Sequence, residues 1–175
     1  MSRKLHIGGT IRAPGWEVLN AIPGEHVDFV GDAANLSNFE DNLFSVLYAS
    51  HILEHMDYID ELNLALSEWY RVLAPGGKLY VSVPDMDVLT RLFQDKENLT
   101  IDDRFMLMRM MFGGHTDDYD YHMVGLNEEF LTEFLKAVGF TNLQKVDVFG
   151  IFQDTSILTM KNELISLNMI AEKNS

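Results

Sequence analysis

Histidines and carboxylates gather in two short segments of this 175-residue chain, and both segments could carry acid–base chemistry. In the first segment, the polar residues Ser50, His51, Glu54 and His55 come directly after the apolar run 43–49. A neutral imidazole can remove a proton from a hydroxyl or an amine, because the unperturbed pKa of histidine is about 6.5. We predict that His51 is a catalytic base; the alternative is that it only lines a pocket. Glu54 and His55 are predicted to be helix caps or partners that orient neighbouring groups.

The second segment, 113–125, contains His, Tyr and Asp at a density that is unusual for a connecting loop. It could cover a substrate, with His122 as the favoured catalytic base and His115, Tyr119 and Tyr121 as substrate-binding residues. The methionine-rich stretch before it could form an adaptable apolar wall. The alternative is a polar surface loop after a core helix. Because no HExxH or comparable ligand spacing is present, no bound metal is predicted.

Hydrophobic periodicity predicts the elements that would hold these groups. The run 43–50 is apolar enough for a strand buried on both faces, and 78–83 is predicted to form a second strand. Between them, apolar residues spaced three and four apart predict a helix, which Pro75-Gly76-Gly77 ends. The stripe predicted to face the sheet consists of Ile59, Leu62, Leu66, Trp69 and Leu73. His51 would then follow the carboxyl end of a parallel strand, where open α/β sheets bind ligands.

The start of the chain predicts strands at 4–7, 17–21 and 27–30. The segment between the first two is too short for a crossover helix, which needs about a dozen residues. The other predicted elements are helices that follow Pro84-Asp85, cover 102–112 and follow Asn127, and strands near 143–149 and 165–171 that pair as an antiparallel edge hairpin. The buried face of the helix after Asn127 is predicted to be Phe130, Leu131, Phe134, Leu135 and Val138. Together these elements predict one α/β domain around a mostly parallel sheet.

The sequences of 43–55 and 71–84 resemble the second half of class I S-adenosylmethionine-dependent methyltransferases. They are most similar to the small methyltransferases in which the fourth strand leads into Ser-His-x-Leu-Glu-His, and the resemblance extends from about Lys4 to Glu172. It implies a single methyltransferase-like domain over 1–175, with a Rossmann-like, mostly parallel sheet, an antiparallel C-terminal edge and no first crossover helix. The implied cofactor is S-adenosylmethionine, and the implied reaction is methyl transfer to an oxygen or nitrogen of a small-molecule acceptor.

The same resemblance assigns cofactor-binding residues in the first part of the chain. Adjacent Gly8 and Gly9 stand where the family carries its glycine-rich cofactor loop, although the usual Gly-x-Gly-x-Gly spacing is missing. Asn20 stands where an acidic residue accepts hydrogen bonds from both ribose hydroxyls. The alternatives are a tight turn for the glycines and an ordinary turn asparagine for Asn20.

Further along, Asp32 and Ala33 resemble the position that contacts the adenine amino group and a ring nitrogen. The alternative for Asp32 is a carboxylate that accepts local amide hydrogen bonds. Ser50 stands beside the position of the methionine end of the cofactor. The resemblance therefore predicts a continuous cofactor site from the first to the fourth strand.

Composition limits the partners. The net charge of −14, without a basic stripe, argues against nucleic acid and anionic membranes. The absence of cysteine excludes a thiol nucleophile and a thiolate metal site. The N-terminal residues lead directly into a predicted strand, so a cytoplasmic protein is expected. The alternative function is a non-catalytic methyltransferase-like subunit or binding protein. A homo-oligomer or a complex with a protein partner is also considered. A nucleotide-dependent oxidoreductase is disfavoured, because the G-x-G-x-x-G that it needs is absent.

Overall fold

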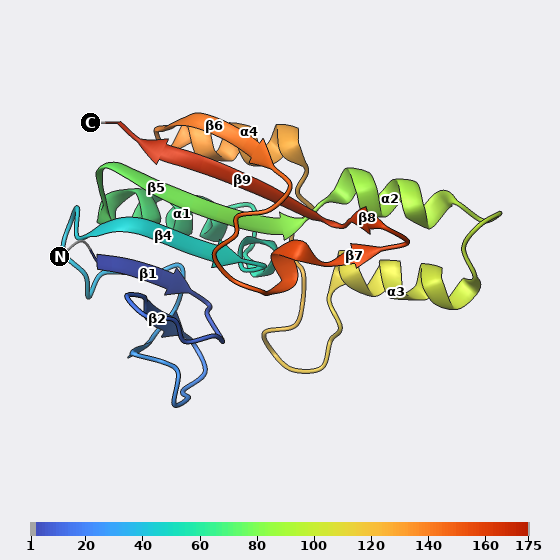
Figure 1. The fold of residues 1–175 in the computed structure, drawn as a ribbon, viewed down its shortest axis with the longest axis horizontal. Helices are drawn as coiled ribbons and strands as arrows, with labels where there is room; N and C mark the ends of the chain where they lie inside the picture. Colours follow the sequence, from blue (N-terminus) through green and yellow to red (C-terminus); the bar gives the residue numbers. More distant parts are fainter. Residues whose placement is uncertain (1–2, 175) are drawn as a thin grey trace.

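One seven-stranded sheet runs through residues 3–174, which are the residues that the computed structural model describes (Figure 1). The strand order is β3-β2-β1-β4-β5-β9-β6, and only β9 runs antiparallel to its neighbours. The strands are β1 (Arg3–Ile7), β2 (Glu17–Asn20), β3 (Phe29–Val30), β4 (Phe44–Ser50), β5 (Leu73–Pro84), β6 (Phe140–Val146) and β9 (Ser166–Lys173). The predicted mostly parallel sheet with an antiparallel C-terminal edge is therefore confirmed. The predicted single domain over 1–175 includes residues 1–2 and 175, which lie outside the described part.

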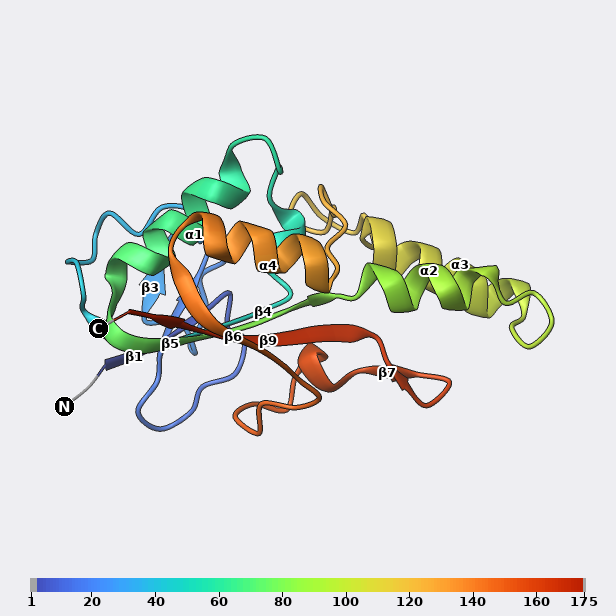
Figure 2. The ribbon, with the colours of Figure 1, turned by 90° about the horizontal axis from the view of Figure 1, so that it is seen from above.

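Two helices, α1 (Glu61–Val72) and α4 (Glu128–Ala137), cover one face of the sheet (Figure 2). The side chains that α1 and α4 bury in the core are Leu62, Ala65, Leu66, Trp69, Val72, Leu131 and Leu135. Two residues predicted in these buried faces are exposed instead: Ile59 at 68% and Phe130 at 54%. Ile59 precedes the first helical residue, so the helical period does not apply to it, and Phe130 is rotated away from the stripe of Leu131 and Leu135.

The helices α2 (Met86–Gln94) and α3 (Ile101–Phe112) extend beyond the carboxyl end of β5, as Figures 1 and 2 show. Asp85 caps α2 by accepting from the backbone N–H of Asp87, and Thr100 and Asp103 form a capping box for α3. The predicted helices after residue 84 are therefore present. No helix among residues 3–174 is long and apolar enough to cross a membrane.

No helix lies between β1 and β2, as the short segment predicted. Residues 8–16 cross over in extended form, and β1 pairs with β2 in parallel, with Leu5 opposite Glu17. On the face of the sheet opposite α1 and α4, aromatic rings take the place of a covering helix. Trp16 and Phe152 pack on Tyr48, with ring centroids 6.2 and 4.8 Å from that of Tyr48. The segment that carries Phe152 lies on the face opposite α1 and α4 (Figure 2).

Some predicted boundaries differ from the structure, most of all in β5, in β6 and in the segment 150–163. β5 begins at Leu73, so Pro75-Gly76-Gly77 forms an irregularity inside the strand, between the pairs Phe44–Leu73 and Val46–Lys78. β6 begins at Phe140 and ends at Val146, a shift from the predicted 143–149. The segment 150–163, which lies between the two predicted C-terminal strands, contains the 3-10 helix η2 (Thr155–Ile157) and part of the hairpin of β7 (Thr159–Met160) and β8 (Glu163–Leu164).

Candidate functional site

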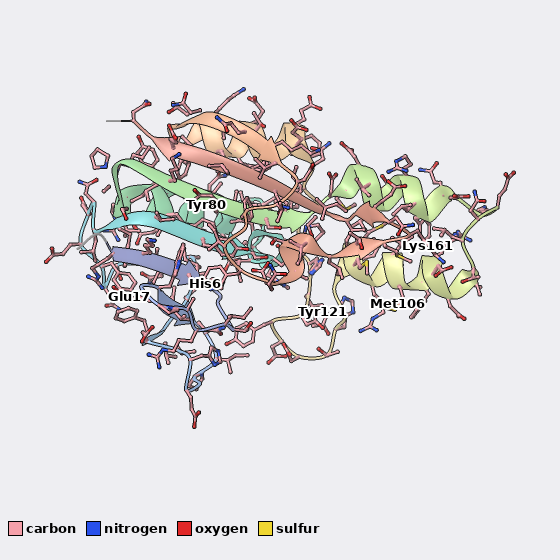
Figure 3. All side chains as sticks on the ribbon, in the orientation of Figure 1. His6, Glu17, Tyr80, Met106, Tyr121 and Lys161 are labelled. Carbon is pink, nitrogen blue, oxygen red and sulfur yellow. The ribbon has the colours of Figure 1, made fainter. Side chains whose placement is uncertain are left out.

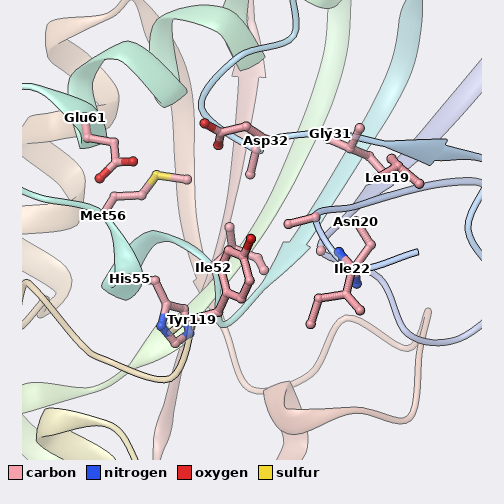
Figure 4. Close-up of a pocket in the computed structure, with 14 residues that line it drawn as sticks. Leu19, Asn20, Ile22, Gly31, Asp32, Ile52, His55, Met56, Glu61 and Tyr119 are labelled. Carbon is pink, nitrogen blue, oxygen red and sulfur yellow. Dashed lines mark hydrogen bonds between the residues drawn. The ribbon is translucent and has the colours of Figure 1, made fainter. Parts of the chain in front are cut away.

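A cavity of about 520 Å³ lies at the carboxyl ends of β1 to β4 (Figure 4). Of the predicted cofactor-binding residues, Gly8, Asn20, Asp32 and Ala33 line it. Gly9 and Ser50 do not. Tyr119, predicted at the acceptor, reaches this cavity instead. The other lining residues are Leu19, Ala21, Ile22, Val30, Gly31, Ile52, His55, Met56 and Glu61, which the sequence analysis did not assign to the site.

Gly8 and Gly9 are required by packing. Gly8 has a φ of +71°, and a Cβ there would overlap the side chain of Ile52, which follows β4. A Cβ on Gly9 would lie 2.6 Å from the ring of His6. The absence of a side chain at Gly8 therefore lets the loop approach the segment after β4 closely, and its absence at Gly9 makes room for the His6 ring of β1.

Asn20 and Asp32 have local hydrogen bonds at the rim of the cavity. Asn20 Nδ2 donates to the Gly9 carbonyl at 3.0 Å, and its Oδ1 accepts from the Ile22 N–H at 2.9 Å. The asparagine thus fixes the glycine loop to the end of β2. Asp32 Oδ1 accepts from the Ala34 N–H at 2.8 Å, which forms an Asx turn and directs the carboxylate to the end of β3.

A second cavity, of about 280 Å³, lies between the end of β4, α3 and the loop 113–125. Both predicted catalytic histidines, His51 and His122, line it, and so do Arg109 and the α3 residues Met106 and Met110. The other lining residues are Pro84, Gly113, Gly114, Asp120, Thr155, Leu158 and Ile165. The structure therefore brings together two segments that are far apart in the sequence.

The loop 113–125 contributes only some of its polar residues to this cavity. His115 and Tyr121 stack on each other, with centroids 4.1 Å apart, and line neither cavity. Asp120 closes the loop, because its Oδ2 accepts from the Thr116 hydroxyl at 2.7 Å. Figure 3 shows Tyr121 on this loop, across from Met106 on α3.

A cluster of ionisable side chains separates the two cavities. His55 lines the first cavity and His122 the second, and their rings meet edge to face with centroids 4.9 Å apart. Glu54, only 1% exposed, lies beside them, and its Oε1 is 3.1 Å from Nδ1 of His51. Glu54 and His55 belong to the 3-10 helix η1 (Leu53–His55) and do not cap α1, whose N-cap residue is Asp60.

The cluster shifts its own pKa values. Burial alone would raise the pKa of Glu54, but the contact with His51 and the nearby His55 hold that pKa below its usual value. Burial lowers the pKa of His122, and the carboxylate of Glu54 opposes this shift only in part. Shifted groups at a cavity wall are typical of functional sites.

The geometry agrees with the comparisons with known proteins. Residues 17–81 match the model of a family described as a methyltransferase domain. Over these residues the chain is similar to methyltransferase domains. A search of curated proteins finds no significant match.

Solved structures align over almost the whole chain, and two of the three described next are named as methyltransferases. A possible exported protein from Bordetella parapertussis aligns over 99% of this chain and 63% of its own length, at 14% identity and a TM-score of 0.61. A possible histamine N-methyltransferase from Thermotoga maritima aligns over 99% and 83%, at 19% identity and a TM-score of 0.60. A Burkholderia thailandensis 1,6-didemethyltoxoflavin-N1-methyltransferase with bound S-adenosylhomocysteine aligns over 99% and 72%, at 16% identity and a TM-score of 0.56. The chain thus spans less than two thirds of the first of these proteins.

Sequence reasoning assigned Glu54 only as a helix cap or an orienting partner and did not predict its buried position at the centre of the cluster. Its burial depends on two hydrogen bonds from another part of the chain, because the Glu54 carbonyl accepts from the N–H groups of Met123 at 2.7 Å and Val124 at 3.3 Å. The spacing His51-x-x-Glu54-His55 is H-x-x-E-H, the reverse of HExxH, so the statement that no comparable ligand spacing is present was wrong.

Proposed function

We propose that this protein is an S-adenosylmethionine-dependent methyltransferase that acts on an oxygen or a nitrogen of a small-molecule acceptor. The observation that carries the proposal is the pair of cavities that meet at His55 and His122, one at the carboxyl ends of β1 to β4 and the other beside it. A cofactor in the first cavity and an acceptor in the second would meet at this cluster. In this proposal residues 1–175 act as one methyltransferase-like domain.

The first cavity fits the cofactor in size and in the placement of Asp32. A cavity of about 520 Å³ is in the range of cofactor sites, and Leu19, Ile22 and Met56 give it apolar walls. Asp32 Oδ1 is engaged with Ala34, so Oδ2 is available for the adenine amino group. Asn20 must give up or share its bond to Gly9 or Ile22 to reach a ribose hydroxyl.

Bound S-adenosylmethionine supplies an activated methyl group, and the protein has to align the acceptor and exclude water. In the second cavity, Met106 and Met110 provide apolar surface and Arg109 provides a cation for an anionic or polar acceptor. The Thermotoga and Burkholderia structures, which are named as methyltransferases, support the methyltransferase activity by their fold, and the bound S-adenosylhomocysteine of the second supports the cofactor.

Of the two predicted bases, His122 is the better placed to touch an acceptor. Both nitrogens of His51 have partners, since Nε2 lies 3.0 Å from the Ser166 hydroxyl and Nδ1 lies 3.1 Å from Glu54. His122 lines the cavity, and its buried Nδ1 has no hydrogen-bond partner among residues 3–174. We therefore assign acceptor contact to His122 and a positioning role to His51.

Isothermal titration with S-adenosylmethionine and with S-adenosylhomocysteine tests the proposal without knowledge of the acceptor. We expect saturable binding of both, with a rise in thermal stability, because a ligand that binds only the folded state stabilises it. The absence of saturable binding up to millimolar ligand would favour the non-catalytic subunit instead.

A further inference from the structure

Glu54 is a buried carboxylate without a conventional hydrogen-bond donor. It is 1% exposed, and neither Oε1 nor Oε2 accepts a hydrogen bond of good geometry from any residue of the described part. Nδ1 of His51 lies 3.1 Å from Oε1, whereas Oε2 has no partner in the described part. A buried carboxylate oxygen without a partner is costly. We infer that Glu54, His55 and His122 bind one divalent transition-metal ion.

The three side chains have the spacing of a metal site. One ligand atom from each of Glu54, His55 and His122 lies within 4.8 Å of the other two. Bonds of about 2.1 Å in a tetrahedral site put ligand atoms about 3.4 Å apart, so small side-chain rotations would close the site. All three residues come from η1 and from the loop 113–125, which pack against each other.

The hydrogen bonds around the cluster leave nitrogen lone pairs available for a cation. His55 Nδ1 lies 3.0 Å from the Tyr121 carbonyl, which can only accept, so Nδ1 carries the proton and Nε2 is free in the neutral ring. Metal-binding histidines commonly donate their other N–H to a carbonyl in this way. This contact therefore orients His55 as a ligand.

The same logic applies to His51, which positions Glu54. The Ser166 hydroxyl has one proton and donates it to the Thr155 carbonyl at 2.8 Å. Ser166 must therefore accept from His51 Nε2, which fixes the ring with Nδ1 3.1 Å from Glu54 Oε1. The imidazole thus holds one oxygen of the Glu54 carboxylate in place beside His55 and His122.

The backbone holds the ligands in place. The Met123 and Val124 N–H groups donate to the Glu54 carbonyl, and the His122 N–H donates to the Phe112 carbonyl at 3.1 Å. His51 adopts a left-handed conformation with a φ of +56°, which turns the chain at the end of β4. The site is therefore largely formed before an ion binds.

The donor set selects the class of ion. Two imidazoles and one carboxylate suit Zn²⁺, Mn²⁺, Fe²⁺ and Co²⁺, whereas Mg²⁺ and Ca²⁺ prefer oxygen ligands. Three protein ligands leave at least one coordination position open, and His122 directs the site toward the second cavity. The net charge of −14 also favours a cation.

A role for the ion in catalysis rests on the proposed function. An acceptor hydroxyl at the open position would have a lowered pKa, because a bound metal ion acts as a Lewis acid. The methyl group would pass from the sulfonium to the acceptor oxygen, the sulfonium would become a thioether, and the hydroxyl proton would leave to solvent. This assignment favours an oxygen acceptor over a nitrogen acceptor.

Titration of the chelator-treated, tag-free protein with Zn²⁺ tests the site, and the visible absorption of Co²⁺ reports its coordination. We expect one ion per chain, with micromolar or tighter affinity and much weaker binding of Mg²⁺. Glu54→Gln and His122→Ala should each weaken Zn²⁺ binding by about 100-fold or more. His115→Ala changes an exposed histidine of the same loop and should leave the affinity unchanged.

Circular dichroism verifies that each variant folds; if Glu54→Gln does not, His122→Ala decides the test. Absence of Zn²⁺ binding by the wild-type protein, or equal affinity in His122→Ala, would overturn the site. Because these titrations contain no S-adenosylmethionine, their result is independent of the proposed function. Ion binding without cofactor binding would contradict the methyltransferase proposal and leave the metal site standing.

Discussion

His6 on β1 and His51 just after the neighbouring strand β4 are both largely covered histidines, yet their surroundings differ completely. His6, 4% exposed on β1, packs between Tyr48 and Phe152, with ring centroids 5.0 and 4.2 Å away. His51 follows β4, with its ring held between Glu54 and a serine hydroxyl. Figure 3 shows His6 on β1, away from Tyr121 and the loop that completes the histidine cluster.

The difference shows what burial does to an imidazole with and without a carboxylate. Burial lowers the pKa of His6 to about 4, and the charge of Asp154 offsets only part of this effect. His6 is therefore neutral at physiological pH and acts as one more ring on the helix-free face of the sheet. The histidines around Glu54 lie against a charge at a cavity wall, and there binding and proton transfer become possible.

The largest expected effect is a loss of stability in acid that depends on His6. Its pKa is about 4 in the folded protein and about 6.5 in the unfolded chain, so between these values the unfolded state binds the extra proton. The contribution of the neutral His6 to the free energy of unfolding is present in full above pH 6.5. It amounts to about 3 kcal/mol and is lost as the pH falls to 4. Urea unfolding at a series of pH values measures this loss.

Other groups also titrate in this range, so the measured quantity is the difference between wild type and His6→Phe. The difference in unfolding free energy should change with pH in favour of the variant below pH 6.5. His115→Phe, at an exposed position, is the matched control and should follow the wild type. Parallel curves for wild type and His6→Phe would show that His6 does not behave as a neutral core residue.

The next prediction concerns turnover and the histidine cluster around Glu54. His122→Ala should lower turnover by about 100-fold, with little change in cofactor affinity, because His122 lies at the acceptor cavity. His115→Ala is the control from the same loop, and turnover should be nearly unaffected. The measurement needs an acceptor found by screening. A variant that loses stability and cofactor affinity together would identify His122 as a structural residue.

The sequence predicted the sheet well because its strands are short, apolar and bounded by turn residues. The apolar run of β4 indicates a buried parallel strand, and Pro75-Gly76-Gly77 marks the end of the helix before β5. The short segment 8–16 indicates that no helix fits between β1 and β2. The hairpin of β7 and β8 was missed. Its turn residues Lys161 and Asn162 have positive φ values of 52° and 65° but no glycine, so the usual signal was absent.

The candidate site was only partly predictable, because its geometry depends on contacts between distant segments. Asp32 and His122 were assigned from their positions, and they line the two cavities. Tyr119 lines the first cavity, whereas His115 and Tyr121 line neither cavity. The sequence of the loop could not predict this difference, because it depends on how residues 113–125 fold over η1. The burial of Glu54 likewise arises from that packing.

Gly8 connects the two regions of the comparison, and its substitution should have a moderate effect. It follows β1, which carries His6, and it packs on Ile52, next to His51. Gly8→Ala should lower the free energy of unfolding by about 2 kcal/mol more than Gly15→Ala. Gly15 is the matched control, because its φ is +77° and no atom lies within 4 Å of a Cβ there. Urea unfolding compares the two variants.

The double variant Gly8→Ala with Ile52→Ala separates steric overlap from backbone strain. Removal of the Ile52 side chain should restore part of the stability lost in Gly8→Ala, measured against Ile52→Ala alone. Equal losses in Gly8→Ala and Gly15→Ala would mean that the contact with Ile52 is not tight in solution. The close approach of the glycine loop to the histidine cluster would then need another explanation.

The smallest expected effect concerns Asp32, which lies at the far end of the first cavity from the cluster. Asp32→Ala should weaken S-adenosylmethionine binding by about tenfold, or about 1.4 kcal/mol, through the loss of one hydrogen bond to the adenine amino group. Asp32→Asn keeps an acceptor oxygen for the ligand and for the Ala34 N–H, so its affinity should fall less. Both variants should retain the acid sensitivity that depends on His6 and the Zn²⁺ affinity of the cluster, because neither site contacts Asp32. Isothermal titration measures the affinities, and unfolding without ligand corrects for the lost Asx turn. An unchanged affinity in Asp32→Ala would remove Asp32 from the adenine site and would leave the histidine cluster as the functional centre of the molecule.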